Sequence, residues 1–163
     1  MLQAGAMGAP FVPVRGLYGS DLMGSGAGFK TIDDPFEPGQ QIVVAPALRP
    51  DIFITHGAVA DREGNVITVD EGRNDLLAAQ ASRRTLVSVE EISEERLSPA
   101  TKPGWVFMPS VYVTAAVPAP GGSLPAGFSG LYPAGEAELQ EYSEAGRSDE
   151  GFKSWLERWV YET

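Results

Sequence analysis

The sequence predicts an α/β fold with an open, largely parallel sheet flanked by helices. Short apolar runs rich in β-branched residues, at residues 51–56 and 85–89, are typical of strands buried in a parallel sheet. A segment with helical periodicity, residues 74–84, lies between these runs, as in a β–α–β unit. The length of 163 residues fits a single domain spanning residues 1–163.

The N-terminal segment predicts a short helix followed by a strand. Residues 2–7 suit one or two helical turns, and Gly8 and Pro10 are typical of a helix end. The apolar residues 11–14 predict a strand that ends before Arg15. No helix start signal precedes the first turn, so we expect the domain to begin upstream of residue 1 and the chain to be N-terminally truncated.

Residues 16–40 are rich in glycine and predict a long loop with a hairpin at its end. The hairpin is expected to pair residues 29–34 with residues 41–44. Within the loop, residues 24–31 lack the glycine that a phosphate-binding loop needs directly before its lysine, Lys30. This stretch is therefore interpreted as a flexible loop.

The middle of the chain predicts the strands of the main sheet and one helix. Asn74 or Asp75 is a suitable cap for a helix that runs to about Arg84. We expect strands at 51–56, 66–69, 85–89 and 110–117, a turn at 61–65 and irregular structure at 93–109.

The C-terminal part predicts a loop and two helices. Residues 118–135 are rich in proline and glycine, and residues 135–145 are acidic and helical in pattern. Ser148 or Asp149 caps a last helix whose apolar stripe comprises Phe152, Trp155, Leu156, Trp159 and Val160. We expect this stripe to pack into the core, with an interface to another subunit as the alternative.

Composition excludes several classes of site. Cysteine is absent, which excludes disulfides, thiolate nucleophiles and cysteine-ligated metals, and the single histidine, His56, excludes a multi-histidine metal centre. The 22 acidic and 12 basic residues give a net charge of −10, so no nucleic-acid partner is expected. No apolar run approaches membrane-spanning length and no signal peptide is evident, so a cytoplasmic protein without membrane contact is expected.

Two loops are candidates for binding an anionic group. Arg15 follows a strand and precedes Gly16, with Ser20 and Asp21 close by; its guanidinium can clamp a carboxylate or phosphate, or pair instead with Asp21. The second loop begins with Gly121 and Gly122, whose backbone amides suit an anion or a carbonyl oxygen, although a plain glycine turn is the alternative.

Two polar residues end predicted buried strands. Glu90 is well placed for a ligand crevice at the carboxyl edge of a sheet, and Glu91, which points to the opposite face, is not expected to share that site. Meeting solvent at a strand end is the alternative interpretation of Glu90. His56 is expected to be a hydrogen-bonded structural residue rather than a catalyst.

Several segments together resemble a known family. They are PFVPVRGLYGSDL at residues 10–22, DDPF at 33–36, VAPAL-x-PD at 44–51, H-x-x-x-AD-x-x-GN at 56–65 and V-x-VEEI at 87–92. Their order and spacing resemble the alpha subunit of family I CoA-transferases, nearest to the glutaconate CoA-transferase type, which includes ring-opening acyl-CoA hydrolases. The resemblance covers roughly residues 3–92, and the tail fits more loosely.

This resemblance implies an open three-layer α/β/α sandwich and an active site shared with a beta subunit. The implied reaction moves CoA between acyl-CoA and a carboxylic acid through a glutamyl-CoA thioester. Coenzyme A is then a substrate, and no metal or organic cofactor is needed. A full alpha subunit is longer, so the chain corresponds to its C-terminal part, as a fragment or one piece of a split subunit.

The resemblance leaves the catalytic nucleophile of this chain unknown, because the family's nucleophilic glutamate lies on the beta subunit or upstream of this region. The candidate substrate- and CoA-binding residues are Arg15, Gly16, Ser20, Asp21, Glu90, Gly121 and Gly122. Leu124 stands where relatives often have a histidine, which weakens any polar role of that loop. An acyl-CoA hydrolase subunit and a non-catalytic assembly domain are the alternative functions.

Overall fold

The computed structural model describes residues 1–24, 26, 28–69 and 74–161. The chain divides into two compact units, Met1–Pro118 and Ala119–Thr163. In the described part of the chain, no helix combines the length and hydrophobicity needed to cross a bilayer.

The first unit begins with a helix and a three-stranded antiparallel sheet. β2 and β3 form the predicted hairpin, with Ile32 opposite Ile42, and β1 pairs with the other edge of β3. A 3-10 turn at Asp21–Gly24 lies within the predicted loop. The bounds are α1, Leu2–Ala6; β1, Phe11–Val14; β2, Lys30–Asp33; and β3, Gln41–Pro46.

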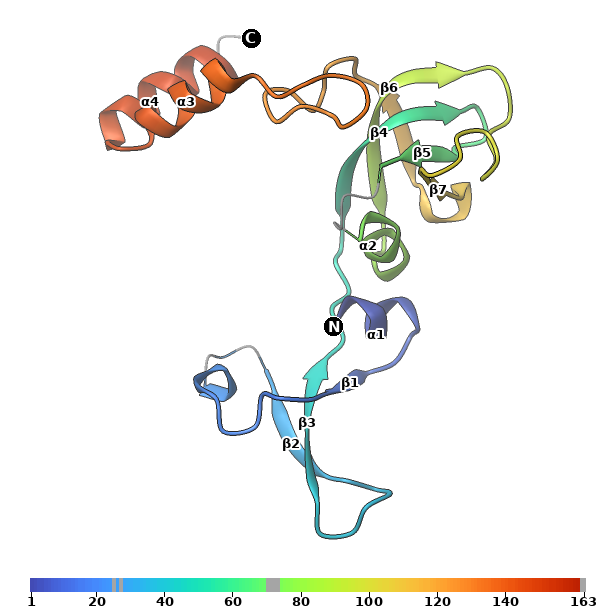
Figure 1. Ribbon diagram of the computed structural model, residues 1–163, viewed down its shortest axis with the longest axis vertical. Helices are drawn as coiled ribbons and strands as arrows, with labels where there is room; N and C mark the ends of the chain where they lie inside the picture. Colours follow the sequence, from blue (N-terminus) through green and yellow to red (C-terminus); the bar gives the residue numbers. More distant parts are fainter. Residues whose placement is uncertain (25, 27, 70–73, 162–163) are drawn as a thin grey trace. The chain divides into compact units, whose positions relative to one another are not determined.

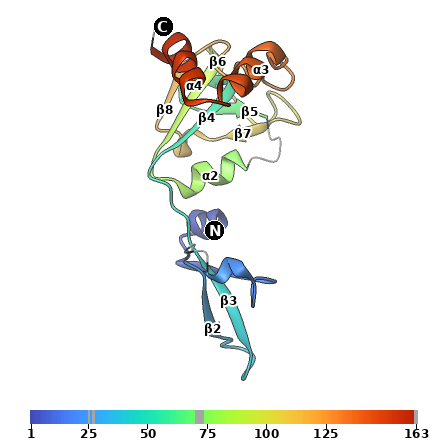
Figure 2. The same ribbon diagram turned by 90° about the vertical axis from the view of Figure 1, so that its left-hand side faces the viewer.

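A five-stranded sheet forms the rest of the first unit, in the order β7-β5-β4-β6-β8 (Figures 1 and 2). β4, β6 and β8 run parallel, whereas β5 and β7 add antiparallel strands at one edge. The open α/β architecture is thus confirmed, with a mixed sheet. The bounds are β4, Phe53–Asp61; β5, Val66–Thr68; β6, Thr85–Ser93; β7, Val106–Met108; and β8, Ala115–Pro118.

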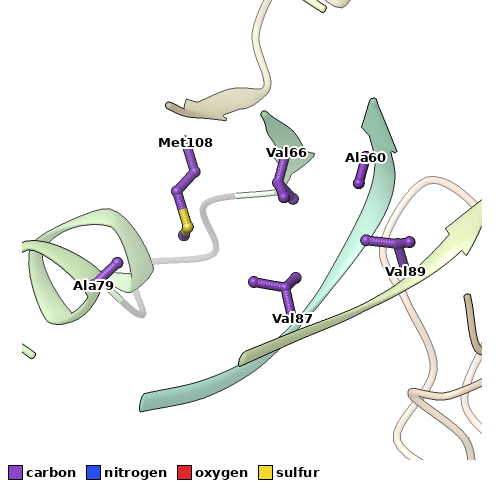
Figure 3. Close-up of a cluster of buried hydrophobic side chains, with 6 residues drawn as sticks. All are labelled: Ala60, Val66, Ala79, Val87, Val89 and Met108. Atoms are coloured by element: carbon purple, nitrogen blue, oxygen red, sulfur yellow. The ribbon is translucent and has the colours of Figure 1, made fainter. Parts of the chain in front are cut away.

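The helix α2, Asp75–Ala81, packs against one face of this sheet (Figure 3). Side chains from Thr85 to Glu90 of β6 alternate in burial, because successive residues of a strand point to opposite faces. Val87 and Val89 are 1% and 0% exposed and face the core. The core cluster comprises Ala60, Val66, Ala79, Val87, Val89 and Met108.

The opposite face of the parallel strands is open. Ile54 of β4 lies opposite Leu86 of β6, and these side chains are 72% and 38% exposed. The apolar run at 51–56 predicted a strand covered on both faces, and this expectation is wrong for the described chain. A β-branched run indicates a strand, but the number of covered faces depends on which elements pack against it.

Two elements differ from the expectation drawn from their sequence. Residues 110–117 were predicted as one strand, but Ser110–Tyr112 form a 3-10 turn and only the end of the segment is extended, as β8. The side-chain oxygen of Asn65 accepts a hydrogen bond from the backbone amide of Ser110 at 3.0 Å, which holds the turn. Conversely, β7 forms inside the segment predicted as irregular because it pairs with β5.

The second unit contains the predicted C-terminal helices, α3 (Glu136–Ala145) and α4 (Asp149–Leu156), which continues as a π-helix over Glu157–Tyr161. Ser148 caps α4 by accepting a hydrogen bond from the amide of Gly151 at 3.1 Å. Trp155 packs edge-on against Tyr142 of α3, with ring centroids 5.0 Å apart. No residue of α4 is buried, so the expected core packing of the whole stripe is not what the described residues show.

Candidate functional site

A chain of three polar side chains spans the adjacent strands β4 and β6. His56 lies directly opposite Ser88, and Glu90 follows two residues later on the same face of β6. His56 Nδ1 is 2.8 Å from Ser88 Oγ, and His56 Nε2 is 2.6 Å from Glu90 Oε1. Both ring nitrogens therefore have a polar partner. The expectation that His56 is hydrogen-bonded is confirmed.

The hydrogen-bond network indicates one arrangement of protons for neutral His56. A carboxylate accepts hydrogen bonds but does not donate them, so Nε2 carries the proton that faces Glu90. Nδ1 then accepts the hydroxyl proton of Ser88. When the ring is charged, both nitrogens donate, and the bond to Glu90 becomes a charge-assisted pair. The backbone oxygen of His56 also accepts a hydrogen bond from Thr68 Oγ1 at 3.2 Å.

The cluster is largely buried, although it lies on the open face of the sheet. The side chains of His56 and Glu90 are 11% and 18% exposed. Apolar neighbours surround them on this face: Ile54 and Leu86 precede His56 and Ser88 along their strands, and Val117 of β8 lies opposite Ser88. Glu90 lies toward the carboxyl end of the parallel strands, the edge at which open α/β sheets bind ligands.

The Arg15 loop follows β1 of the three-stranded sheet. Arg15 and Gly16 are exposed, and Gly16 adopts φ 85°, a conformation that favours glycine. Ser20 Oγ donates to the carbonyl of Leu17 at 2.8 Å, which closes a tight turn before Asp21. Within the described ranges no ion pair joins Arg15 to Asp21, so the alternative in which Asp21 holds Arg15 is not the one adopted.

The glycine pair at 121 and 122 lies in the second unit, in a turn directly after β8. The amide of Gly122 donates to the carbonyl of Ala119 at 2.9 Å, and the carbonyl of Gly121 accepts from the amide of Leu124 at 2.9 Å. Gly121 has φ 74°. Beyond this turn, a cavity of about 370 Å³ is lined by Leu124, Pro125, Gly135, Glu138, Trp155 and Trp159.

The structure thus places the predicted site residues in three locations. Arg15, Gly16, Ser20 and Asp21 share one loop; Glu90 lies on the five-stranded sheet; and Gly121 and Gly122 lie in the second unit. In the structure, His56 contacts both Glu90 and Ser88. The sequence analysis did not identify Ser88 as a site residue. Aligning the two predicted strands from their first residues, 51 and 85, would have placed His56 beside Glu90, two residues from its actual partner Ser88.

Among the described residues, the other sequence motifs add no second group of candidate binding residues. The glycine-rich stretch at 24–31 lies partly outside the described residues, and Lys30 begins β2. Across the described ranges, no three histidine, aspartate or glutamate side chains are grouped so as to hold a metal ion.

Comparison with known proteins gives consistent sequence matches. The model of the family described as "Coenzyme A transferase" matches residues 1–117. The A subunit of the 3-oxoadipate CoA-transferase of Pseudomonas knackmussii is 33% identical over 96% of this chain and 54% of that protein. The A subunit of the glutaconate CoA-transferase of Acidaminococcus fermentans is 31% identical over 99% of this chain and 55% of that protein. The chain therefore spans about half the length of these relatives.

Relatives with other reactions also match. The IpdA subunit of the cholesterol ring-cleaving hydrolase of Mycobacterium tuberculosis is 29% identical over 98% of this chain and 57% of that protein. Among solved structures, the glutaconate CoA-transferase of Acidaminococcus fermentans matches with a TM-score of 0.88 and 30% identity, over 99% of this chain and 56% of that chain. A variant of the decarboxylase AibA/AibB matches with a TM-score of 0.77 and 36% identity, over 95% and 56%.

Proposed function

This chain belongs to the coenzyme A transferase family, and from that premise we propose that it serves as the alpha subunit, or part of it, of a heteromeric CoA-transferase. The observation that carries the proposal is the similarity of almost the whole chain to the A subunits of two CoA-transferases, in sequence and in fold. The proposed partner is a CoA-transferase beta subunit, and the proposed location is the cytoplasm.

The proposed reaction moves CoA between an acyl-CoA and a carboxylic acid. The carboxylate of a glutamate replaces the acyl group on the CoA sulfur, the first acid leaves as its carboxylate, and the glutamyl-CoA thioester then passes its CoA to the second acid. The thioester is retained at each exchange, so neither metal nor organic cofactor is required. We expect the nucleophilic glutamate on the partner protein.

In this proposal the chain contributes substrate contacts. The exposed guanidinium of Arg15 is suited to a phosphate of CoA or the carboxylate of the acid, and the turn of Gly16, Ser20 and Asp21 presents it. Glu90 provides a fixed carboxylate at the sheet edge. Gly121 and Gly122 provide a close approach for the chain of the substrate, because they have no side chain.

A hydrolase is the second candidate function, favoured by the similarity to the IpdA subunit of a ring-cleaving hydrolase. The two reactions share an activated acyl group and differ in what attacks it. A second carboxylate acts in transfer, whereas water acts in hydrolysis.

The test is co-expression with a CoA-transferase beta-type subunit, followed by an assay with acetyl-CoA and glutaconate-like acids. We expect a stable complex, CoA transfer that requires the acceptor acid, and a covalent CoA adduct on the partner that mass spectrometry detects. Release of free CoA without an acceptor would assign the hydrolase function instead. Absence of both complex and turnover would contradict both enzyme functions.

The same assay tests the role of Arg15. R15Q removes a charged hydrogen-bond donor, so we expect the KM for acyl-CoA to rise about tenfold. R83Q is the matched control, because Arg83 is also exposed and its guanidinium lies 3.7 Å from Asp51. An unchanged KM in R15Q would remove Arg15 from the proposed site.

A further inference from the structure

The single histidine of this chain is fixed at both ring nitrogens. Its partners, Ser88 and Glu90, lie on the neighbouring strand, one directly opposite and one two residues further along. The imidazole ring therefore connects Ser88 and Glu90, two residues of β6 that lie on the same face of the strand. A ring held by one partner can still turn, whereas a ring held at both nitrogens has one orientation.

Strand pairing holds the backbone around this bridge. β4 and β6 pair on both sides of His56, from Phe53 with Thr85 to Gly57 with Val89, and again from Val59 with Glu91 to Asp61 with Ser93. The residues of β6 that flank Ser88 are Val87 and Val89, whose side chains are fully buried on the other face of the sheet. The positions of the three polar side chains thus follow from strand pairing and core packing rather than from a loop.

The surroundings explain why the hydrogen bond from His56 fixes the position of the Glu90 carboxylate. The side chain of Glu90 is 18% exposed, so its carboxylate has lost much of its contact with water and a hydrogen bond from the protein stabilises it. His56 supplies a hydrogen bond to Oε1 and so holds the carboxylate at the edge of the sheet. Ser88 in turn keeps the ring from rotating away.

We propose that His56 is a positioning residue: Ser88 holds its ring, and the ring fixes the carboxylate of Glu90 for contact with the acid or acyl group at this edge of the sheet. This inference rests on the proposed function and extends it, because it assigns Glu90 a substrate contact that depends on His56. The role requires a hydrogen-bond donor at Nε2 and no change in the charge of the ring.

Two substitutions separate positioning from acid–base chemistry. The side-chain amide nitrogen of glutamine reaches about as far as Nε2, so H56Q keeps a donor toward Glu90. H56N reaches only toward Ser88 and leaves Glu90 without this donor. In the complex with the beta-type subunit, we expect H56N to lower kcat about 10- to 100-fold with KM within about twofold, and H56Q to restore most of kcat.

E91Q is the matched control, because Glu91 is adjacent and exposed. We expect it to leave kcat and KM unchanged. Wild-type kinetics in H56N would overturn the inference. Equal losses in H56Q and H56N would also overturn it, because they would show that the imidazole itself is required.

A spectroscopic arm keeps the inference distinct from the proposed function. With one histidine in the chain, the ¹⁵N-labelled imidazole gives a single set of ring signals at a fixed pH. We expect a slowly exchanging proton on Nε2 in the wild type and in E91Q, and its loss in E90A. A wild-type complex without turnover would refute the proposed function alone; a ring signal unaffected by E90A would refute the positioning of Glu90 by His56.

Discussion

Asp61 shows how one buried carboxylate determines local structure in this chain. Oδ1 accepts hydrogen bonds from the backbone amides of Glu63 and Asn65, both at 2.9 Å. Oδ2 accepts from the side chain of Asn65 and the amide of Leu97, both at 2.8 Å. Burial by itself raises the pKa of Asp61, but these hydrogen bonds outweigh it and hold the pKa below its usual value of 3.8.

The first prediction is that Asp61 makes stability dependent on pH in the acid range. Because the folded-state pKa is lowered, the contribution of Asp61 is complete above pH 3.8 and is lost as the pH falls through the folded-state pKa. D61N should lower the free energy of unfolding at pH 7 by about 1–3 kcal/mol, because its amide group cannot accept all four bonds. Urea unfolding of both proteins between pH 7 and pH 3 should show the difference shrinking at the acid end.

D51N is the control for this prediction, since the side chain of Asp51 is 87% exposed. We expect it to leave the pH dependence unchanged. A difference between D61N and the wild type that stays constant from pH 7 to pH 3 would mean that the charge of Asp61 is not its source.

At the scale of elements, α1 is positioned by close contact with its neighbours. A Cβ added at Gly5 would overlap the carbonyl oxygen of Leu48 and lie 3.3 Å from the Cβ of Ala81 in α2. The amide of Leu48 also donates to the carbonyl of Met1 at 3.2 Å. Glycine thus lets this helix approach both the segment that follows β3 and the end of α2.

The second prediction concerns the sign of the G5A effect. Helix propensity alone favours alanine by about 1 kcal/mol. Overlap with a backbone carbonyl opposes this gain, so we expect G5A to lower the free energy of unfolding by about 1–3 kcal/mol. Urea unfolding followed by circular dichroism measures the change. G24A is the control, because no heavy atom lies within 4 Å of a Cβ added there; a stabilised G5A protein would contradict the close contact.

At the scale of the whole molecule, the open face of the five-stranded sheet is the feature that most favours self-association. Ile54, Leu86 and Val117 are 72%, 38% and 55% exposed, on strands that lie side by side. Apolar side chains that adjoin on an uncovered face favour association. We therefore expect this chain by itself to be marginally stable and to self-associate.

The third prediction follows from this face. I54K places a charge beside Leu86 on the apolar face without disturbing the core, because the side chain of Ile54 is 72% exposed. Sedimentation velocity of the chain alone should show less self-association for I54K than for the wild type. V111K is the control, since Val111 is 78% exposed in the 3-10 turn before β8. A monodisperse wild-type monomer would contradict the prediction.

Local sequence was sufficient where structure depends on neighbouring residues. Glycine and proline placed the turns, the alternation at residues 29–44 predicted the hairpin of β2 and β3, and the aromatic stripe with Ser148 predicted α4. The order of motifs over residues 10–92 identified the coenzyme A transferase family, which the family match confirms. These features can be predicted from the sequence because each depends on a short stretch of the chain.

Tertiary structure decided what depends on distant residues. The sequence proposed Glu90 and considered His56, but only the parallel register of β4 and β6 brings His56 into contact with both Glu90 and Ser88. Likewise, pairing with β5 makes a strand of Val106–Met108, and the packing of α2 buries one face of the sheet while Ile54 remains exposed. Periodicity records which residues share a face, whereas strand partners and covering helices are set by contacts between segments far apart in the chain.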